Sequence, residues 1–160
     1  MTLDQLNSLD VGTRREALGR CCGAGGWLDR MEELFPAESV EALYAAAEKA
    51  WSECSAEDGL EAFSHHPRIG EQQLRDKWAS GEQSGVNQAL ESVLQGLAAG
   101  NAAYEKKFGY IFLVCATGKS AEEMLLLLRE RLNHGPEEEI RIAMGEQGKI
   151  TRLRLEKLLT

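Results

Sequence analysis

The short stretch "FSHHPRIG", residues 63–70, holds two of the chain's three histidines, His65 and His66. An imidazole changes its charge near neutral pH, so histidine is the side chain best suited to moving protons under physiological conditions. Pro67 and Gly70 follow the pair and should end any helix there, because proline cannot continue a helix and fixes its own backbone angle. The stretch therefore predicts a rigid loop that presents a titratable imidazole.

Arg154 is a charged residue on the otherwise apolar side of an expected helix. It follows Ile150 by four residues and precedes Leu158 by four, so helical periodicity places all three on one face, whereas Arg152 points away. Burying a charge costs several kcal/mol unless a partner or a ligand compensates for it. An inward arginine offers a fixed fork of donors, which suits a carboxylate or a planar, amide-rich ligand.

Glu82 is a second inward charge, in the first turn of another expected helix. It precedes Val86 by four residues and Leu90 by eight, and it therefore projects along the core-facing side. Gly81 and Gly85 flank it, and their lack of side chains would let a ligand or another backbone come close. A carboxylate in this place is suited to orienting an imidazole or a substrate.

Each of these residues also has an ordinary structural explanation. Glu82 would favour the positive end of its helix, Arg154 would extend its charge into water, and the histidines would be hydrogen-bonded loop residues. A metal site at His65 and His66 is disfavoured, because adjacent histidines point apart and no third ligand lies at useful spacing. Taken together, an imidazole, a carboxylate and a guanidinium describe one site. The sequence contains no nucleophile elbow, phosphate loop or dinucleotide fingerprint, which leaves cofactor-free proton chemistry.

The elements that must position these residues are predicted to be helices, so the expected fold is all-α, in a single domain over residues 1–160. Two helices have a clear start signal, because Ser55 with Asp58 and Ser120 with Glu123 have capping-box spacing. Gly100 is expected to break or kink its helix. Residues 110–116 have strand-like composition, but a lone strand has nothing to pair with, so buried irregular or helical structure is expected. The expected helices span residues 39–54, 55–65, 81–107, 120–133 and 136–159.

The composition is that of an ordinary globular domain, since 43% of the 160 residues are hydrophobic and 28% are charged. The net charge of -8 argues against a nucleic-acid partner, because phosphate binding needs a clustered positive field. No apolar run approaches the roughly 20 residues that cross a bilayer, and no secretory signal begins the chain, so we expect no membrane association and a cytoplasmic location. Reduced, partly buried thiols are expected at the four cysteines, Cys21, Cys22, Cys54 and Cys115.

Several segments together carry a family resemblance, although each alone would be a weak signal. They are "CCGAGGW" at 21–27, "EAFSHHPRIG" at 61–70, "GEQSG" at 81–85, "YEKKFGYIFLVCATGKS" at 104–120, "ERLNHGPEEE" at 130–139 and "KITRLRLEKLL" at 149–159. With them the chain resembles the 2-oxo-4-hydroxy-4-carboxy-5-ureidoimidazoline (OHCU) decarboxylases of urate degradation, over nearly all of its length. The resemblance implies an all-α homodimer that acts on a small-molecule substrate without a metal or an organic cofactor. It also suggests functional coupling to hydroxyisourate hydrolase.

The resemblance also implies roles for particular residues. His66 would be the catalytic histidine, Glu82 the active-site acid and Arg154 the substrate-binding arginine. Some members have a serine three residues before this glutamate; here the position is Ala79, with Ser80 beside it, so Ser80 or water would replace that hydroxyl. The pocket would further be lined by Pro67, Gln83, Phe108 and the backbone from Tyr110 through Ile111 to Phe112.

The implied reaction is the decarboxylation of OHCU to (S)-allantoin. Two other hypotheses stay open from the sequence. One is an acidic, all-α adaptor whose inward charges are only structural, which an exposed apolar groove would indicate. The other is the same fold acting on a different ureido or imidazoline acid. A comparison of CO2 release with the spontaneous decay of the substrate separates these hypotheses.

Overall fold

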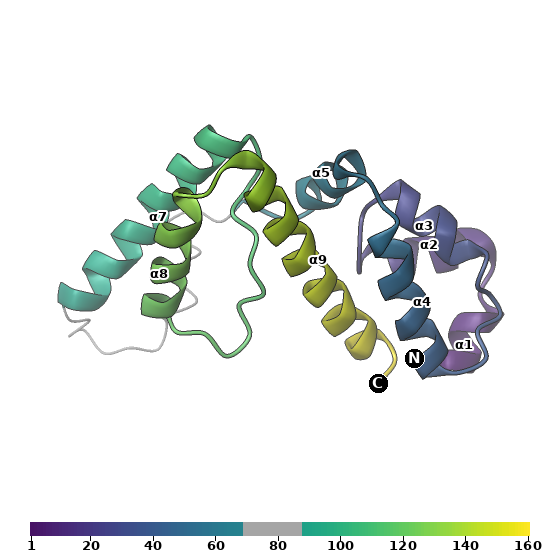
Figure 1. Ribbon diagram of the computed structural model, residues 1–160. Helices are drawn as coiled ribbons and strands as arrows, with labels where there is room; N and C mark the ends of the chain where they lie inside the picture. Colours follow the sequence, from purple (N-terminus) through teal and green to yellow (C-terminus); the bar gives the residue numbers. More distant parts are fainter. Residues whose placement is uncertain (69–87) are drawn as a thin grey trace. The chain divides into compact units, whose positions relative to one another are not determined.

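The computed structural model describes residues 1–68 and 88–160, and every regular element in these two stretches is an α-helix (Figure 1). The expected all-α class is thereby confirmed for the described residues. The chain divides into two compact units, one formed by Met1–His65 with Ile142–Thr160 and the other by His66–Arg141. The last helix, α9 (Pro136–Leu158), contributes residues to both units.

The first unit contains five short helices and most of α9. The predicted capping box at Ser55 is confirmed, since its hydroxyl accepts from the Asp58 amide while the Asp58 carboxylate accepts from the Ser55 amide. The amino group of Met1 donates to the Leu158 carbonyl at 2.9 Å, which brings the two termini together. The five helices are α1 (Leu3–Ser8), α2 (Val11–Gly19), α3 (Gly25–Glu32), α4 (Val40–Ser52) and α5 (Ala56–Ser64).

Two tryptophans connect the helices of the first unit. Trp27 of α3 is fully buried, and its indole N–H donates to the Ala47 carbonyl of α4 at 3.1 Å. Trp51 of α4 donates in the same way to the Met144 carbonyl of α9 at 2.8 Å. A buried tryptophan needs such a partner for its N–H, and each bond therefore fixes one helix against another.

The second unit is dominated by α7 (Gln88–Phe108) and α8 (Ala121–Leu132), which pack against each other (Figure 1). The predicted capping box of Ser120 and Glu123 starts α8. The core between the two helices consists of Leu94, Leu97, Tyr104, Ala121, Met124, Leu125 and Leu128.

The expected break at Gly100 is wrong, because α7 continues through this residue to Phe108. The reason for a glycine lies in the packing of α7 on α8. A Cβ atom at position 100 would stand 2.5 Å from Cδ2 of Leu128, which is closer than two carbon atoms can approach. Gly100 therefore allows α8 to lie close to α7.

Residues 110–116 have no helical or strand structure, which confirms the irregular alternative, but the expected burial is limited to Leu113. Gly109 ends α7 with a positive φ of 85°, the left-handed conformation that glycine adopts most readily after a helix. Leu113 is buried, while its neighbours Ile111 and Phe112 are partly exposed. Among the described residues, no helix has the length and hydropathy needed to cross a membrane.

Candidate active site

The histidine loop begins directly after α5. His65 is the C-cap residue of α5, and His66 is half-buried while Pro67 is exposed. Arg68 forms an ion pair with Glu105 of α7, and both residues belong to the second unit. Glu82 and Gln83, the acid and the amide predicted for the site, lie outside the described residues.

His65 packs against the backbone at Gly23. A Cβ atom at position 23 would lie 2.4 Å from Cδ2, 2.5 Å from Cγ and 2.9 Å from Cβ of His65. Because these atoms are close to the His65 backbone, that residue could not give way by a simple side-chain rotation. The contact therefore fixes the residue that directly precedes His66.

Phe108, Ile111 and Phe112, the predicted apolar lining, all belong to the second unit at the end of α7 and just beyond it. The ring centroid of Tyr104 lies 4.6 Å from that of Phe108 and 5.3 Å from that of Phe112. Such tilted and edge-on arrangements are the favourable geometries for aromatic pairs. The structure thus brings Phe108 and Phe112 into one aromatic group around Tyr104.

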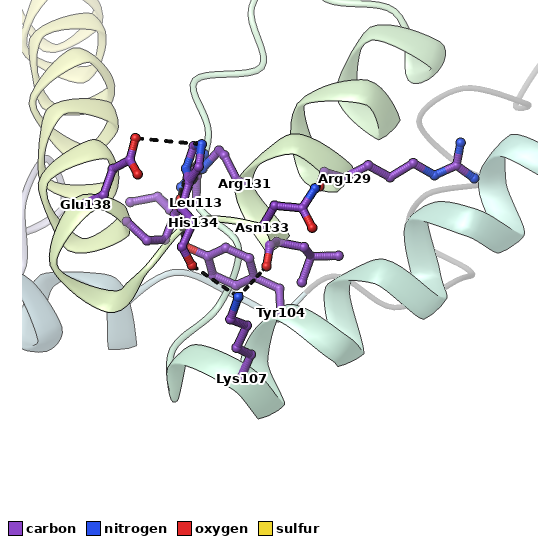
Figure 2. A network of polar contacts seen from close by, with 10 residues as sticks. Tyr104, Lys107, Leu113, Arg129, Arg131, Asn133, His134 and Glu138 are labelled. Carbon is purple, nitrogen blue, oxygen red and sulfur yellow. Dashed lines mark hydrogen bonds and ion pairs between the residues drawn. The ribbon is translucent and has the colours of Figure 1, made fainter.

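The hydroxyl of Tyr104 also belongs to a buried polar network (Figure 2). Arg131 is 4% exposed and Glu139 is 0% exposed. Nε of Arg131 donates to Oε2 of Glu139 at 2.7 Å, and Nη1 donates to the Leu113 carbonyl at 2.7 Å. The Tyr104 hydroxyl donates to the same carboxylate, and the guanidinium lies 4.6 Å from the ring centroid of Phe112.

The network continues toward the surface at the end of α8. Nδ1 of His134 lies 3.1 Å from Oε1 of Glu139, and Nε2 lies 3.9 Å from a Glu138 oxygen. Lys107 of α7 donates to the carbonyls of Leu132 and His134, at 2.5 Å and 3.1 Å. These bonds satisfy the exposed carbonyls where α8 ends and join this end to α7.

Burial raises the pKa of Tyr104 far above its ordinary value, and the hydrogen bond to Glu139 raises it further. Burial likewise raises the pKa of Tyr110. Both phenols are therefore protonated at neutral pH. Tyr104 acts as a fixed donor to the carboxylate and is not a candidate base.

Arg154, the predicted substrate-binding residue, is half-buried in the first unit, and its Nη1 donates to the Arg20 carbonyl at 3.3 Å. Next to this carbonyl stand Cys21 and Cys22, both buried. Burial raises the pKa of each thiol to about 11. They are thus neutral, unreactive groups at pH 7, and none of the four cysteines forms a disulfide bond, as expected.

A separate cavity of about 420 Å³ lies between α4 and α9 in the first unit. Its lining includes Tyr44, Trp51 and Arg152. Arg152 is exposed, and its guanidinium stacks on the Tyr44 ring at 3.9 Å from its centroid. The described residues predicted for the active site are not part of the lining.

Sequence reasoning missed Arg131 and Glu139. The signal was present, because Arg131 follows Leu128 by three residues and Met124 by seven, and therefore lies on the buried face of α8. The rule that identified Arg154 as an inward charge applies equally here. Glu139 stands in the acidic run "PEEE" at the start of α9, where any acid favours the helix dipole, and nothing in this run marks the fourth residue as the buried one.

Comparison with known proteins gives consistent results. The family model for OHCU decarboxylase matches residues 7–156. The chain is 38% identical over 147 residues to the uric acid degradation bifunctional protein TTL of Arabidopsis thaliana, covering 88% of this chain but 45% of that protein. It is 27% identical to a 2-oxo-4-hydroxy-4-carboxy-5-ureidoimidazoline decarboxylase of Haloferax volcanii, covering 97% of this chain and 94% of the relative.

A solved structure agrees with these matches. It is a crystal structure of OHCU decarboxylase in the presence of (S)-allantoin, with a TM-score of 0.72 and 36% sequence identity. The alignment covers 88% of this chain and 95% of that chain. This chain therefore spans less than half of the plant relative, but nearly all of the archaeal relative and of the solved chain.

Proposed function

The chain belongs to the OHCU decarboxylase family, and we propose that it decarboxylates 2-oxo-4-hydroxy-4-carboxy-5-ureidoimidazoline to (S)-allantoin in urate degradation. The observation that carries this proposal is the family match from residue 7 to residue 156, which runs through both compact units. The same match supports a single OHCU decarboxylase domain over residues 1–160. An adaptor would not require an inward arginine and a loop histidine in the family's positions.

Three side chains would carry the reaction. His66 is the proposed catalytic acid and base, Glu82 the carboxylate that binds the substrate's ureido or hydroxyl donors, and Arg154 the group that holds its anionic or carbonyl oxygens. The motifs "HHPRIG", "GEQSG" and "TRLRL" support these assignments. Pro67, Gln83, Phe108, Ile111 and Phe112 would line the pocket.

In the proposed reaction, the substrate's own ring accepts the electrons and the side chains of the protein supply the protons. Loss of CO2 breaks the bond between the carboxylate carbon and the ring, and leaves an electron pair that the ring's own imine and carbonyl can delocalise. The protein then has to orient the carboxylate across the ring plane and to move protons. His66 would take the proton of the hydroxyl next to the carboxylate and return a proton to one face of the ring, which would set the (S) configuration.

The proposed partners are a second copy of the chain, in a homodimer, and the hydroxyisourate hydrolase step of urate degradation. The relatives from Arabidopsis thaliana and Bacillus that are named bifunctional uric acid degradation proteins support such coupling, since each is longer than this chain. An unstable substrate would favour direct transfer from the enzyme that forms it. A cytoplasmic location remains a prediction from the sequence.

The experiment that tests the function compares CO2 release from freshly generated substrate with and without the protein. We expect release well above spontaneous decay, together with optically pure (S)-allantoin. Racemic allantoin formed at the spontaneous rate would refute the proposal. Activity on another ureido acid, but none on OHCU, would refute the substrate assignment alone.

A further inference from the structure

The buried ion pair of Arg131 and Glu139 also holds an irregular segment of backbone in place. One nitrogen of the guanidinium donates to the Leu113 carbonyl at 2.7 Å, while its other side meets Glu139 at 2.6 Å and 2.7 Å. Phe112, the residue before Leu113, lies beneath the guanidinium at 4.6 Å. The side chain of Arg131 thus fixes both the backbone at Leu113 and the ring of Phe112.

This arrangement is poorly explained as a device for stability alone. A buried ion pair is often no more stabilising than well-packed apolar residues of similar volume, because the cost of desolvating the two charges offsets their attraction. What a guanidinium does supply is geometry, since its donors leave in fixed directions. Residues 111–116 lack the regular backbone pairing of a helix, so their conformation depends on contacts of this kind.

We propose that Arg131 and Glu139 are positioning residues for the substrate-contacting segment Ile111–Leu113. The proposal rests on the proposed function, in which Ile111 and Phe112 line the substrate pocket. Glu139 and Tyr104 aim the guanidinium, the guanidinium holds the Leu113 carbonyl, and the two residues before Leu113 are thereby held for the substrate. Neither member of the ion pair needs to touch the substrate.

The principal variant replaces both members, Arg131→Met with Glu139→Gln. This pair of changes removes the donor to Leu113 without leaving an unpaired buried charge, and the glutamine still accepts from Tyr104. The matched control is Leu125→Ala, because Leu125 is buried in the same interface and packs against Gly96. Gly96 lies twelve residues before Phe108, which corresponds to about 18 Å along α7.

We expect the double variant to raise both KM and the Kd for (S)-allantoin by about tenfold to a hundredfold. A misplacement of active-site groups by 1 Å can change a reaction rate by about a hundredfold, which sets this scale. Leu125→Ala should lose stability but change both constants less than threefold at a matched folded fraction. Arg131→Lys, which keeps a positive charge and a single donor nitrogen, should restore part of the affinity. The carbonyl carbon resonance of Leu113 should shift in the double variant and not in the control.

Equal effects of the double variant and of Leu125→Ala on KM, Kd and the Leu113 resonance would overturn the proposal. If the double variant does not fold, Arg131→Lys is compared with Leu125→Ala instead, on the same three measurements. The lysine keeps a positive charge beside Glu139, so this variant leaves no unpaired buried carboxylate. A wild-type protein without decarboxylase activity would refute the proposed function instead. The resonance of Leu113 needs no substrate and would still report whether the ion pair holds the segment.

Discussion

His65 and His66 are neighbours with the same side chain and different expected roles. Proton transfer by a positioned side chain contributes about 10²–10⁴ in rate, so His66→Asn should lose a factor in this range while keeping the fold. His65→Asn should be much milder, because that ring packs against Gly23. Initial rates of CO2 release, with thermal unfolding as the folding control, check this order. The reverse order would show that His65 is the catalytic residue.

Gly23 should be sensitive to the smallest substitution. In Gly23→Ala the new methyl group would collide with the Cβ and Cγ atoms of His65, so the loop that starts there must shift. We expect kcat to fall by about tenfold or more, because His66 moves with its neighbour. Gly19→Ala is the control, since its methyl group would meet Leu28 at an ordinary 3.8 Å. Equal kcat values for the two variants would contradict this account.

Cys21 and Cys22 should make the protein less stable in alkali. Each thiol has its pKa raised by burial from 9.0 to about 11, so between these values the folded chain holds protons that the unfolded chain has released. The free energy of unfolding therefore falls as pH rises from 9 to 11, by about 2 kcal/mol for each thiol. Urea unfolding at pH 8 and pH 10.5 measures this loss. The free energy of unfolding of Cys22→Ala should fall less than that of the wild type over the same pH interval. An equal fall would contradict the assignment of this pH dependence to the Cys22 thiol.

At the scale of helices, Gly100 and Gly145 should respond to alanine in opposite directions. Alanine normally stabilises a helix by about 1 kcal/mol relative to glycine, and at Gly145 the added methyl group meets nothing within 4 Å. At Gly100 it would overlap Leu128 of α8, so Gly100→Ala should cost about 1–3 kcal/mol. Denaturant midpoints for the two variants give the sign of each change. Stabilisation by Gly100→Ala would show that α7 and α8 are not so close.

Elements with strong local signals were predictable from the sequence. The serines at positions 55 and 120 fixed the starts of α5 and α8, because a capping box depends only on residues within one turn. Helices α1 to α3 are short and were not delimited, since their stability comes from packing that periodicity does not record. The continuation of α7 through Gly100 was not predictable for the same reason, because the explanation of this glycine lies on another helix.

Within the candidate site, the residues that sequence reasoning singles out are those with a local motif. His66 stands in a distinctive loop sequence, and Arg154 interrupts an apolar stripe. The partnership of Arg131 with Glu139 joins two helices through a buried pair and a backbone carbonyl, which no spacing along the chain encodes. Such non-local pairs require the fold before they can be seen.

For the molecule as a whole, the central claim is that His66, Glu82 and Arg154 act on one substrate. They are far apart along the chain, and the family motifs that contain them extend through both compact units. If all three serve one reaction, each must contact the same ligand, either within a protomer or across a dimer. Catalysis by proton transfer and orientation demands contacts at hydrogen-bonding distance.

The most direct test is a crystal structure of the protein with (S)-allantoin bound. We predict that the imidazole of His66, the carboxylate of Glu82 and the guanidinium of Arg154 all lie within about 3.2 Å of ligand atoms. A structure in which the His66 imidazole and the Arg154 guanidinium stand on the order of tens of ångströms apart, both within a protomer and across any dimer, would contradict the account.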